Sequence, residues 1–164
     1  WGKGPGIAVL LLDASKGLLP VLFAKSQGLP SYWFVLAGMA AMLGHIFSPF
    51  LGFKGGKGVA TGLGVMTGLS PLVSGISLFV FIVTVWTTRF VSLGSILGAI
   101  AMTLAFFFVP KNFLTGDSLP YQIFGVVAGA FIVFRHKDNI KRLRNGTESK
   151  FGQKVVPQSE QARK

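Results

Sequence analysis

Long apolar stretches alternate with short polar breaks along most of the chain. Four of them are clear, at 7–23, 33–42, 93–109 and 123–134, and the last two contain no charged residue. A helix needs roughly 20 mostly apolar residues to cross the hydrocarbon core of a bilayer. Together with their flanking residues, the four stretches therefore predict four membrane-spanning helices.

A fifth apolar stretch, 59–88, is interrupted by a Ser70-Pro71 pair. The residue before a proline disfavours the helical conformation, so we expect a break at Ser70. The first arm, 59–69, would rise only about 16 Å, which is about half of the hydrocarbon core. A segment of this kind is tolerated only where it packs inside protein or lines a wet cavity. We therefore expect a short broken, re-entrant-like helical hairpin around residues 59–88, with both ends at the same membrane face.

The composition agrees with a membrane protein. Hydrophobic residues make up 51% of the chain and charged residues only 13%, whereas soluble domains carry about a quarter charged residues. This excludes the ordinary soluble classes and predicts an all-α integral membrane protein, a polytopic helical bundle. We expect residues 1–152 to form one polytopic membrane domain and residues 153–164 to form a polar, disordered tail.

The positive charges orient the bundle. Nine of the 16 Lys and Arg residues lie from Arg135 onward. Cytoplasmic segments carry an excess of Lys and Arg, so this tail is predicted to lie on the cytoplasmic side. If the hairpin returns to the side from which it enters, counting the spans places the segment 52–61 and Ser92 on that side too.

The segment 52–61 reads GFKGGKGVAT and combines glycines with lysines. Glycine backbone can approach an anion closely, and a helix that begins near Val59 would direct its positive dipole end at the same place. The spacing is not that of a Walker A loop, because only three residues separate Gly52 from Gly56 where four are required. The pattern favours a phosphate-binding loop. A loop whose lysines only contact lipid head groups explains these ten residues equally well.

The basic segment 134–150 follows the last span. In a helix, His136 and Asn139 would share one face, next to several arginines, and would present a polar, cationic patch at the membrane boundary. The alternative is an ordinary basic segment that binds acidic lipids. Neither histidine of the chain has a second histidine or a carboxylate at ligand spacing, so no metal site is expected.

Two smaller features complete the set of candidates. Asp13 and Lys16 lie one turn apart inside the first span, where ionisable groups are either paired or functional. Ser92 opens the span at 91–109, where it is expected either to cap the helix or to donate to a bound phosphate.

These motifs occur in a characteristic order. The stretches GHIFSPFLGFKGGKGVAT (44–61) and RHKDNIKRLRNGTESK (135–150), with DASKG (13–17) and VSLGS (91–95), resemble the bacterial PlsY family of acyl-phosphate:glycerol-3-phosphate acyltransferases. The resemblance implies an enzyme of the bacterial cytoplasmic membrane with its active site on the cytoplasmic face. Such an enzyme transfers a fatty acyl group from acyl phosphate to the 1-hydroxyl of glycerol 3-phosphate, which gives lysophosphatidic acid for phospholipid biosynthesis. It implies membrane lipids as surroundings, no cofactor and no nucleic-acid partner.

The resemblance also suggests roles for the candidates. An acyl phosphate is already activated, so positioning and charge stabilisation suffice without a covalent acyl intermediate. We expect backbone amides and hydroxyls to assist one lysine at the departing phosphate, and the basic segment to bind glycerol 3-phosphate. The proton acceptor is either a histidine or a substrate phosphate oxygen. The expected catalytic residues are Lys57, Ser92, His136 and Asn139, and the expected phosphate-binding residues are Lys54, Gly55, Gly56, Gly58, Thr61 and Arg142.

The chain departs from the family at its start. The family carries a glycine- and asparagine-rich loop between its first two spans, and nothing here matches that loop, so we expect a further span and the loop upstream of Trp1. The His-x-x-x-x-Asp motif of acyl-CoA-dependent acyltransferases is also missing, since Phe50 and Lys141 stand where its aspartate would be. The alternative function is a small transporter or lipid-head-group-binding protein whose loop holds phosphate without chemistry.

Overall fold

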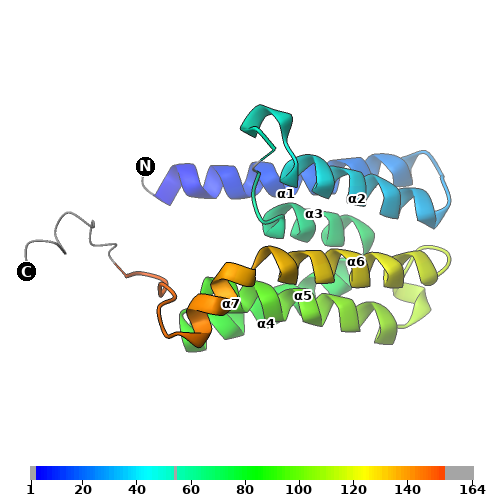
Figure 1. Ribbon diagram of the computed structural model, residues 1–164. Coiled ribbons are helices and arrows are strands. Elements are labelled where there is room, and N and C mark those ends of the chain that lie inside the picture. Colours follow the sequence, from blue (N-terminus) through cyan, green and yellow to red (C-terminus); the bar gives the residue numbers. More distant parts are fainter. Residues whose placement is uncertain (1–2, 54, 154–164) are drawn as a thin grey trace, which may run out of the picture.

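The structure is a computed structural model that describes residues 3–53 and 55–153, and within them every regular element is a helix (Figure 1). Consecutive long helices run back and forth along the bundle. The all-α prediction is confirmed. The elements are α1 (Lys3–Ser26), α2 (Ser31–Ile46), α3 (Val59–Leu69), α4 (Pro71–Thr88), α5 (Val91–Phe108), α6 (Leu119–Arg135) and α7 (Lys137–Arg144), with 3-10 turns at Pro49–Leu51 and Lys111–Phe113.

The helices form two groups, which contact each other through α3 and α4 and through α6. Helix α1 packs against α2 and α3, α4 packs against α5, and α6 contacts α5 as well as α2 and α3. The core between them is apolar, with Val21, Val65, Met102, Tyr121 and Phe124 almost fully buried. The outer faces also carry many exposed large apolar side chains. An apolar core inside an apolar exterior is the arrangement expected of a bundle that lies in lipid.

The predicted spans correspond to helices of membrane length. Among the described residues, α1, α4 and α5 are each long and apolar enough to cross a bilayer, and so is Ser31–Leu51, which joins α2 to the 3-10 turn after it. Helix α6 is followed by α7 after a bend of 56°, and this pair is a further candidate span. The bend falls at His136, where the apolar sequence gives way to the basic segment.

The break in the hairpin falls where the sequence places it. Ser70 ends α3 and is also the N-cap of α4, with Pro71 at the first helical position, where its missing N–H is not needed. The Lys25 amine donates to the carbonyl of Leu69, 3.1 Å away, and so satisfies the end of α3. Of the two arms of the hairpin, only α3 is short. The 18 residues of α4 rise about 27 Å, which is long enough to cross the hydrocarbon core.

Two glycines let α1 and α3 approach closely. A Cβ on Gly64 would meet the carbonyl group of Ala14, and a Cβ on Gly17 would meet the carbonyl oxygen of Thr61. Small residues allow helices in membranes to pack backbone against backbone. This contact holds the short α3 inside the protein, as a helix that does not span the membrane requires.

The close contact predicts a difference between two glycine-to-alanine substitutions. Gly64→Ala places a methyl group against backbone that cannot rotate away, so the free energy of unfolding should fall by about 1–3 kcal/mol. Gly75→Ala on α4 is the matched control, because its Cβ would meet nothing within 4 Å. Thermal unfolding of the purified proteins in detergent measures both. Equal unfolding temperatures for the two variants would contradict the packing of α1 on α3.

Candidate active site

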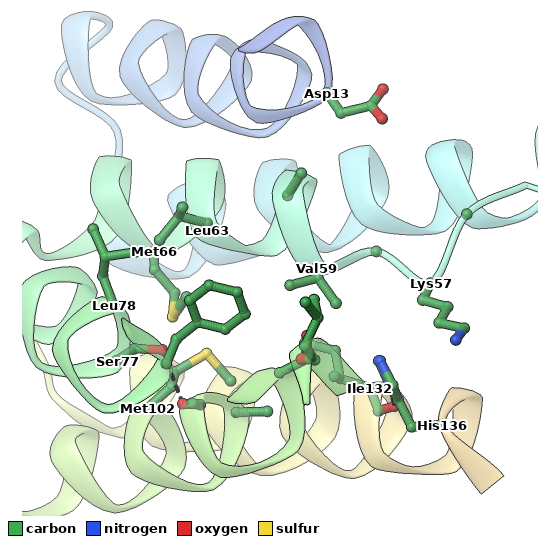
Figure 2. A pocket seen from close by; sticks show the side chains of 18 of the residues that line it. Asp13, Lys57, Val59, Leu63, Met66, Ser77, Leu78, Met102, Ile132 and His136 are labelled. Carbon is green, nitrogen blue, oxygen red and sulfur yellow. Dashed lines mark hydrogen bonds between the residues drawn. The ribbon is translucent and has the colours of Figure 1, made fainter. Parts of the chain in front are cut away.

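A pocket of about 500 Å³ lies between α3, α4 and α5, with contributions from α1 and α6. Its ionisable side chains, among them Asp13, Lys57 and His136, lie toward one end, and mostly apolar side chains line the rest (Figure 2). The pocket therefore suits a ligand with a charged head and a hydrocarbon body. The polar end includes Asp13, His45, Lys57, Ser92 and His136, and the apolar part includes Leu63, Met66, Phe81, Ala99, Met102 and Ile132.

The glycine-lysine loop is folded onto the end of α2. The Gly55 amide donates to the carbonyl of Ile46 at 3.0 Å, and a Cβ on Gly56 would meet the ring of His45. Gly58 has a φ of 79° at the N-cap of α3, a conformation that glycine adopts without strain. The loop is thus anchored by its own backbone, and the Gly55 amide, which we expected to bind phosphate, is used inside the protein.

Lys57 leaves this loop and meets the basic segment. Its Nζ donates to Oδ1 of Asn139 on α7, 82 residues away in sequence. The guanidinium of Arg135 donates to the carbonyls of Gly55 and Gly56 at 3.3 and 3.4 Å, which ties α6 to the same loop. The structure therefore brings together two motifs that are distant in the chain.

A carboxylate that sequence analysis missed completes the cluster. Glu148 Oε1 accepts from Asn139 Nδ2 and from Ser92 Oγ, each at 2.6 Å, and Oε2 accepts from Arg142 Nε at 2.7 Å. The Glu148 side chain is only 7% exposed. Three of the predicted site side chains, Ser92, Asn139 and Arg142, thus bind an internal anion, which shows that their donors converge on one point.

The end of α7 explains how Glu148 reaches this position. The Gly146 amide donates to the carbonyl of Leu143 and the Thr147 amide to that of Arg142, at 3.2 and 2.9 Å, and Gly146 has a φ of 68°. This is the Schellman pattern that reverses the chain after a helix. The sequence signal was an isolated glutamate just after an Asn145-Gly146 pair in an otherwise basic segment.

Ser92 does not cap α5, which was one of the two roles expected for it. The N-cap of α5 is Phe90, not Ser92. The Ser92 hydroxyl is buried and donates to Glu148 instead. The capping alternative is therefore wrong, and the hydroxyl lies at the polar end of the pocket.

His136 lies at the bend between α6 and α7 and is 2% exposed. Its Nδ1 is 2.8 Å from the carbonyl oxygen of Ile132. Because a carbonyl only accepts, Nδ1 is the donor, and in the neutral ring Nε2 then keeps its lone pair. Burial lowers the pKa of His136, the hydrogen bond to Ile132 opposes this in part, and the charge of Lys57 lowers the pKa further. The ring is therefore neutral near pH 7 and able to accept a proton.

The other charges also influence one another. Burial lowers the pKa of Lys57, the Arg142 guanidinium lowers it further, and Glu148 opposes both effects. Burial raises the pKa of Glu148, but the hydrogen bonds from Ser92, Asn139 and Arg142 outweigh burial, so its pKa is lowered overall. The cluster thus holds an ionised carboxylate among positive charges.

The remaining candidates lie elsewhere. Thr61 is fully buried on α3 and does not line the pocket, and its hydroxyl has no hydrogen-bond partner among the described residues. Asp13 pairs with Lys16 at 2.8 Å and lies 3.6 Å from Nδ1 of His45, so the ion-pair interpretation of Asp13 fits the structure. Lys54 lies outside the described residues.

Metal ligands are not grouped in the part of the chain that the structure describes. No three His, Cys, Asp or Glu residues there are placed to hold an ion.

A bundle of membrane-length helices with a cationic cluster at the mouth of an apolar pocket defines an integral membrane protein that handles an anionic amphiphile. Comparison with known proteins agrees. A family model described as glycerol-3-phosphate acyltransferase matches residues 1–146. A glycerol-3-phosphate acyltransferase of Geobacter sulfurreducens is 48% identical over 151 residues, which cover 92% of this chain and 74% of that protein.

Two solved structures are also similar. They are the glycerol 3-phosphate form and the lysophosphatidic acid form of PlsY (YgiH), described as an integral membrane glycerol 3-phosphate acyltransferase. Both are 41% identical to this chain and cover 92% of it, and the match spans 73% and 74% of those chains, with TM-scores of 0.82 and 0.83. The chain belongs to the glycerol-3-phosphate acyltransferase family.

The buried histidine predicts a pH dependence of stability. Its folded-state pKa is lower than the ordinary value of 6.5, so below pH 6.5 the unfolded chain binds more protons than the folded protein does. Stability should therefore fall as the pH drops through 6.5 and level off below the folded-state pKa. In His136→Gln this part of the dependence should be missing.

Thermal unfolding between about pH 8 and pH 5 measures the effect. The pKa of Glu148 is lowered from 4.5, so the dependence of stability on Glu148 falls below pH 4.5 and outside this range. Parallel pH profiles for the wild type and His136→Gln would contradict a neutral, buried His136.

Proposed function

We propose that this protein transfers a fatty acyl group from acyl phosphate to the 1-hydroxyl of glycerol 3-phosphate, which gives lysophosphatidic acid and inorganic phosphate. The observation that carries the proposal is the cluster of Lys57, Asn139, Glu148 and Ser92 at the mouth of an apolar pocket. The family supports it, because solved relatives are described as glycerol 3-phosphate and lysophosphatidic acid forms.

The apolar part of the pocket suits the acyl chain of the donor. Its walls come from α3, α4 and α5, and Leu78 and Val91 at its edge are exposed on the side of the bundle. An acyl phosphate dissolved in the membrane can enter from that side without passing through water. Its phosphate then meets the positive charge of Lys57, since ionised donors bind phosphate oxygens most strongly.

The reaction needs charge stabilisation and one proton transfer. The 1-hydroxyl oxygen attacks the acyl carbonyl carbon, the bond from that carbon to the phosphate oxygen breaks, and phosphate departs with the electron pair. Lys57 and Arg142 stabilise the negative charge that develops. The hydroxyl proton passes either to Nε2 of His136, which is neutral and unprotonated, or to an oxygen of a substrate phosphate.

We place this site on the cytoplasmic face of the inner membrane. Nine of the 16 Lys and Arg residues lie from Arg135 onward, and this excess marks the cytoplasmic side. Hydrogen bonds link Glu148 of the same segment to Ser92 and, through Asn139, to Lys57. The glycine-lysine loop, the start of α5 and the basic segment would then face the same compartment, which supplies glycerol 3-phosphate.

Loss of the Lys57 amine tests its role. Lys57→Ala should lower kcat/KM for lysophosphatidic acid formation from palmitoyl phosphate by about 10²–10³-fold, because a preorganised donor at the departing phosphate is removed. Lys141→Ala, which removes the same group from an exposed position on α7, should stay near the wild-type value. Near-normal turnover of Lys57→Ala would exclude the lysine from the catalytic machinery.

Cysteine labelling tests the orientation, and the chain has no cysteine of its own. In intact bacterial cells, Ser48→Cys, Arg89→Cys and Lys141→Cys should be protected from a membrane-impermeant maleimide, whereas Asn112→Cys should react. After the cells are broken, all four should react. Labelling of Arg89→Cys but not of Lys141→Cys in intact cells would contradict the shared cytoplasmic face.

A further inference from the structure

The apolar pocket has a defined inner end. Figure 2 shows Lys57 and His136 at one end of the pocket, and Met66, Ser77 and Met102 at the opposite end. Met66 and Met102 are 5% and 1% exposed, so both are held within the core. A ligand that enters with its head at Lys57 therefore directs its tail toward these two methionines.

A hydrogen bond and a close backbone contact join α4 to α5 at the inner end of the pocket. The buried Ser77 hydroxyl of α4 donates to the Gly98 carbonyl of α5 at 2.9 Å. A Cβ on Gly98 would lie only 3.2 Å from the Ser77 carbonyl oxygen, so the two helices are already at their closest approach. Interhelical hydrogen bonds and small residues both hold membrane helices together. The inner end of the pocket consequently has a fixed position and does not yield as an open groove would.

The depth of the pocket matches a lipid chain. Met102 lies ten positions after Ser92 of the polar end along α5, which is a rise of about 15 Å. The hydrocarbon core is about 30 Å thick, so this depth equals about one leaflet. A straight acyl chain of the kind that fills one leaflet would extend from the cluster to the methionines.

We propose that Met66 of α3 and Met102 of α5, the latter one turn after the Ser77–Gly98 contact, form a floor that sets the acyl-chain length accepted by the enzyme. The proposal rests on the proposed function, because it assigns the pocket to the acyl chain of the donor. A chain that is too long meets the floor, and one that is too short leaves apolar space unfilled. The floor thus selects among straight-chain acyl phosphates.

Two substitutions with opposite expected effects test the floor. Met102→Ala lowers it, and Ala99→Leu, one turn nearer the polar end, raises it. The readout is the ratio of kcat/KM for palmitoyl phosphate to that for dodecanoyl phosphate. One or two methylenes in an apolar pocket change discrimination by about tenfold or more, so Met102→Ala should raise the ratio by about tenfold and Ala99→Leu should lower it by as much.

Matched controls separate the floor from general packing. Met39→Ala and Ala101→Leu make the same changes at partly buried positions that do not line the pocket, and both should keep the wild-type ratio. The ratio is measured within one preparation, so it does not depend on the folded fraction of a variant. If Ala99→Leu fails to fold, the two single variants Met102→Ala and Met66→Ala still test the floor, because each should raise the ratio.

The outcomes distinguish the two proposals. If the wild type forms no lysophosphatidic acid from any acyl phosphate, the proposed function fails and the floor fails with it. If the wild type is active and the ratio is the same in Met102→Ala, Met66→Ala and the controls, the floor is overturned and the proposed function stands. A shift of the ratio in the lining variants alone supports the floor.

Discussion

The ionised carboxylate of Glu148 is the interaction on which the site depends. It accepts hydrogen bonds from Ser92 at the start of α5 and from Asn139 and Arg142 on α7. Asn139 in turn accepts from Lys57, so one anion connects the glycine-lysine loop, α5 and the basic segment. Without it, the positive charges of this cluster would repel one another at a partly buried position, where the repulsion is strongest. The same charges bind the phosphates of both substrates in the proposed reaction.

The short helix α3 sets the depth at which this chemistry takes place. A helix of 11 residues cannot cross the bilayer, so its polar ends have to be satisfied within the protein. The Lys25 amine satisfies the Leu69 carbonyl at one end, and the loop anchored on α2 begins the helix at the other. The glycine contacts with α1 hold α3 between these points. As a result, Lys57 lies at the mouth of a pocket whose apolar part continues into the bundle (Figure 2).

Much of this arrangement was predictable from the sequence, because it follows from length and charge. The break at Ser70-Pro71 follows from the conformational restriction before proline. Counting the spans places the loop, Ser92 and the basic segment at one membrane face, and the hydrogen bonds among Lys57, Asn139, Glu148 and Ser92 agree with this. What could not be predicted depends on tertiary contacts. Glu148 reaches the cluster through a chain reversal after α7, and the Gly55 amide is occupied by the Ile46 carbonyl. Thr61 follows the loop closely in sequence, but it lies on the face of α3 that packs against α1 near Gly17, so it is buried.

The most direct measurement of the central claim is the product of the purified protein in lipid nanodiscs and in sealed vesicles. It is supplied with palmitoyl phosphate and labelled glycerol 3-phosphate. If the cluster at the pocket mouth is an acyl-transfer site, lysophosphatidic acid and inorganic phosphate appear in equal amounts, and palmitoyl-CoA does not replace palmitoyl phosphate. Transport of labelled glycerol 3-phosphate into the vesicles with no lysophosphatidic acid formed would contradict an enzyme and would indicate a transporter.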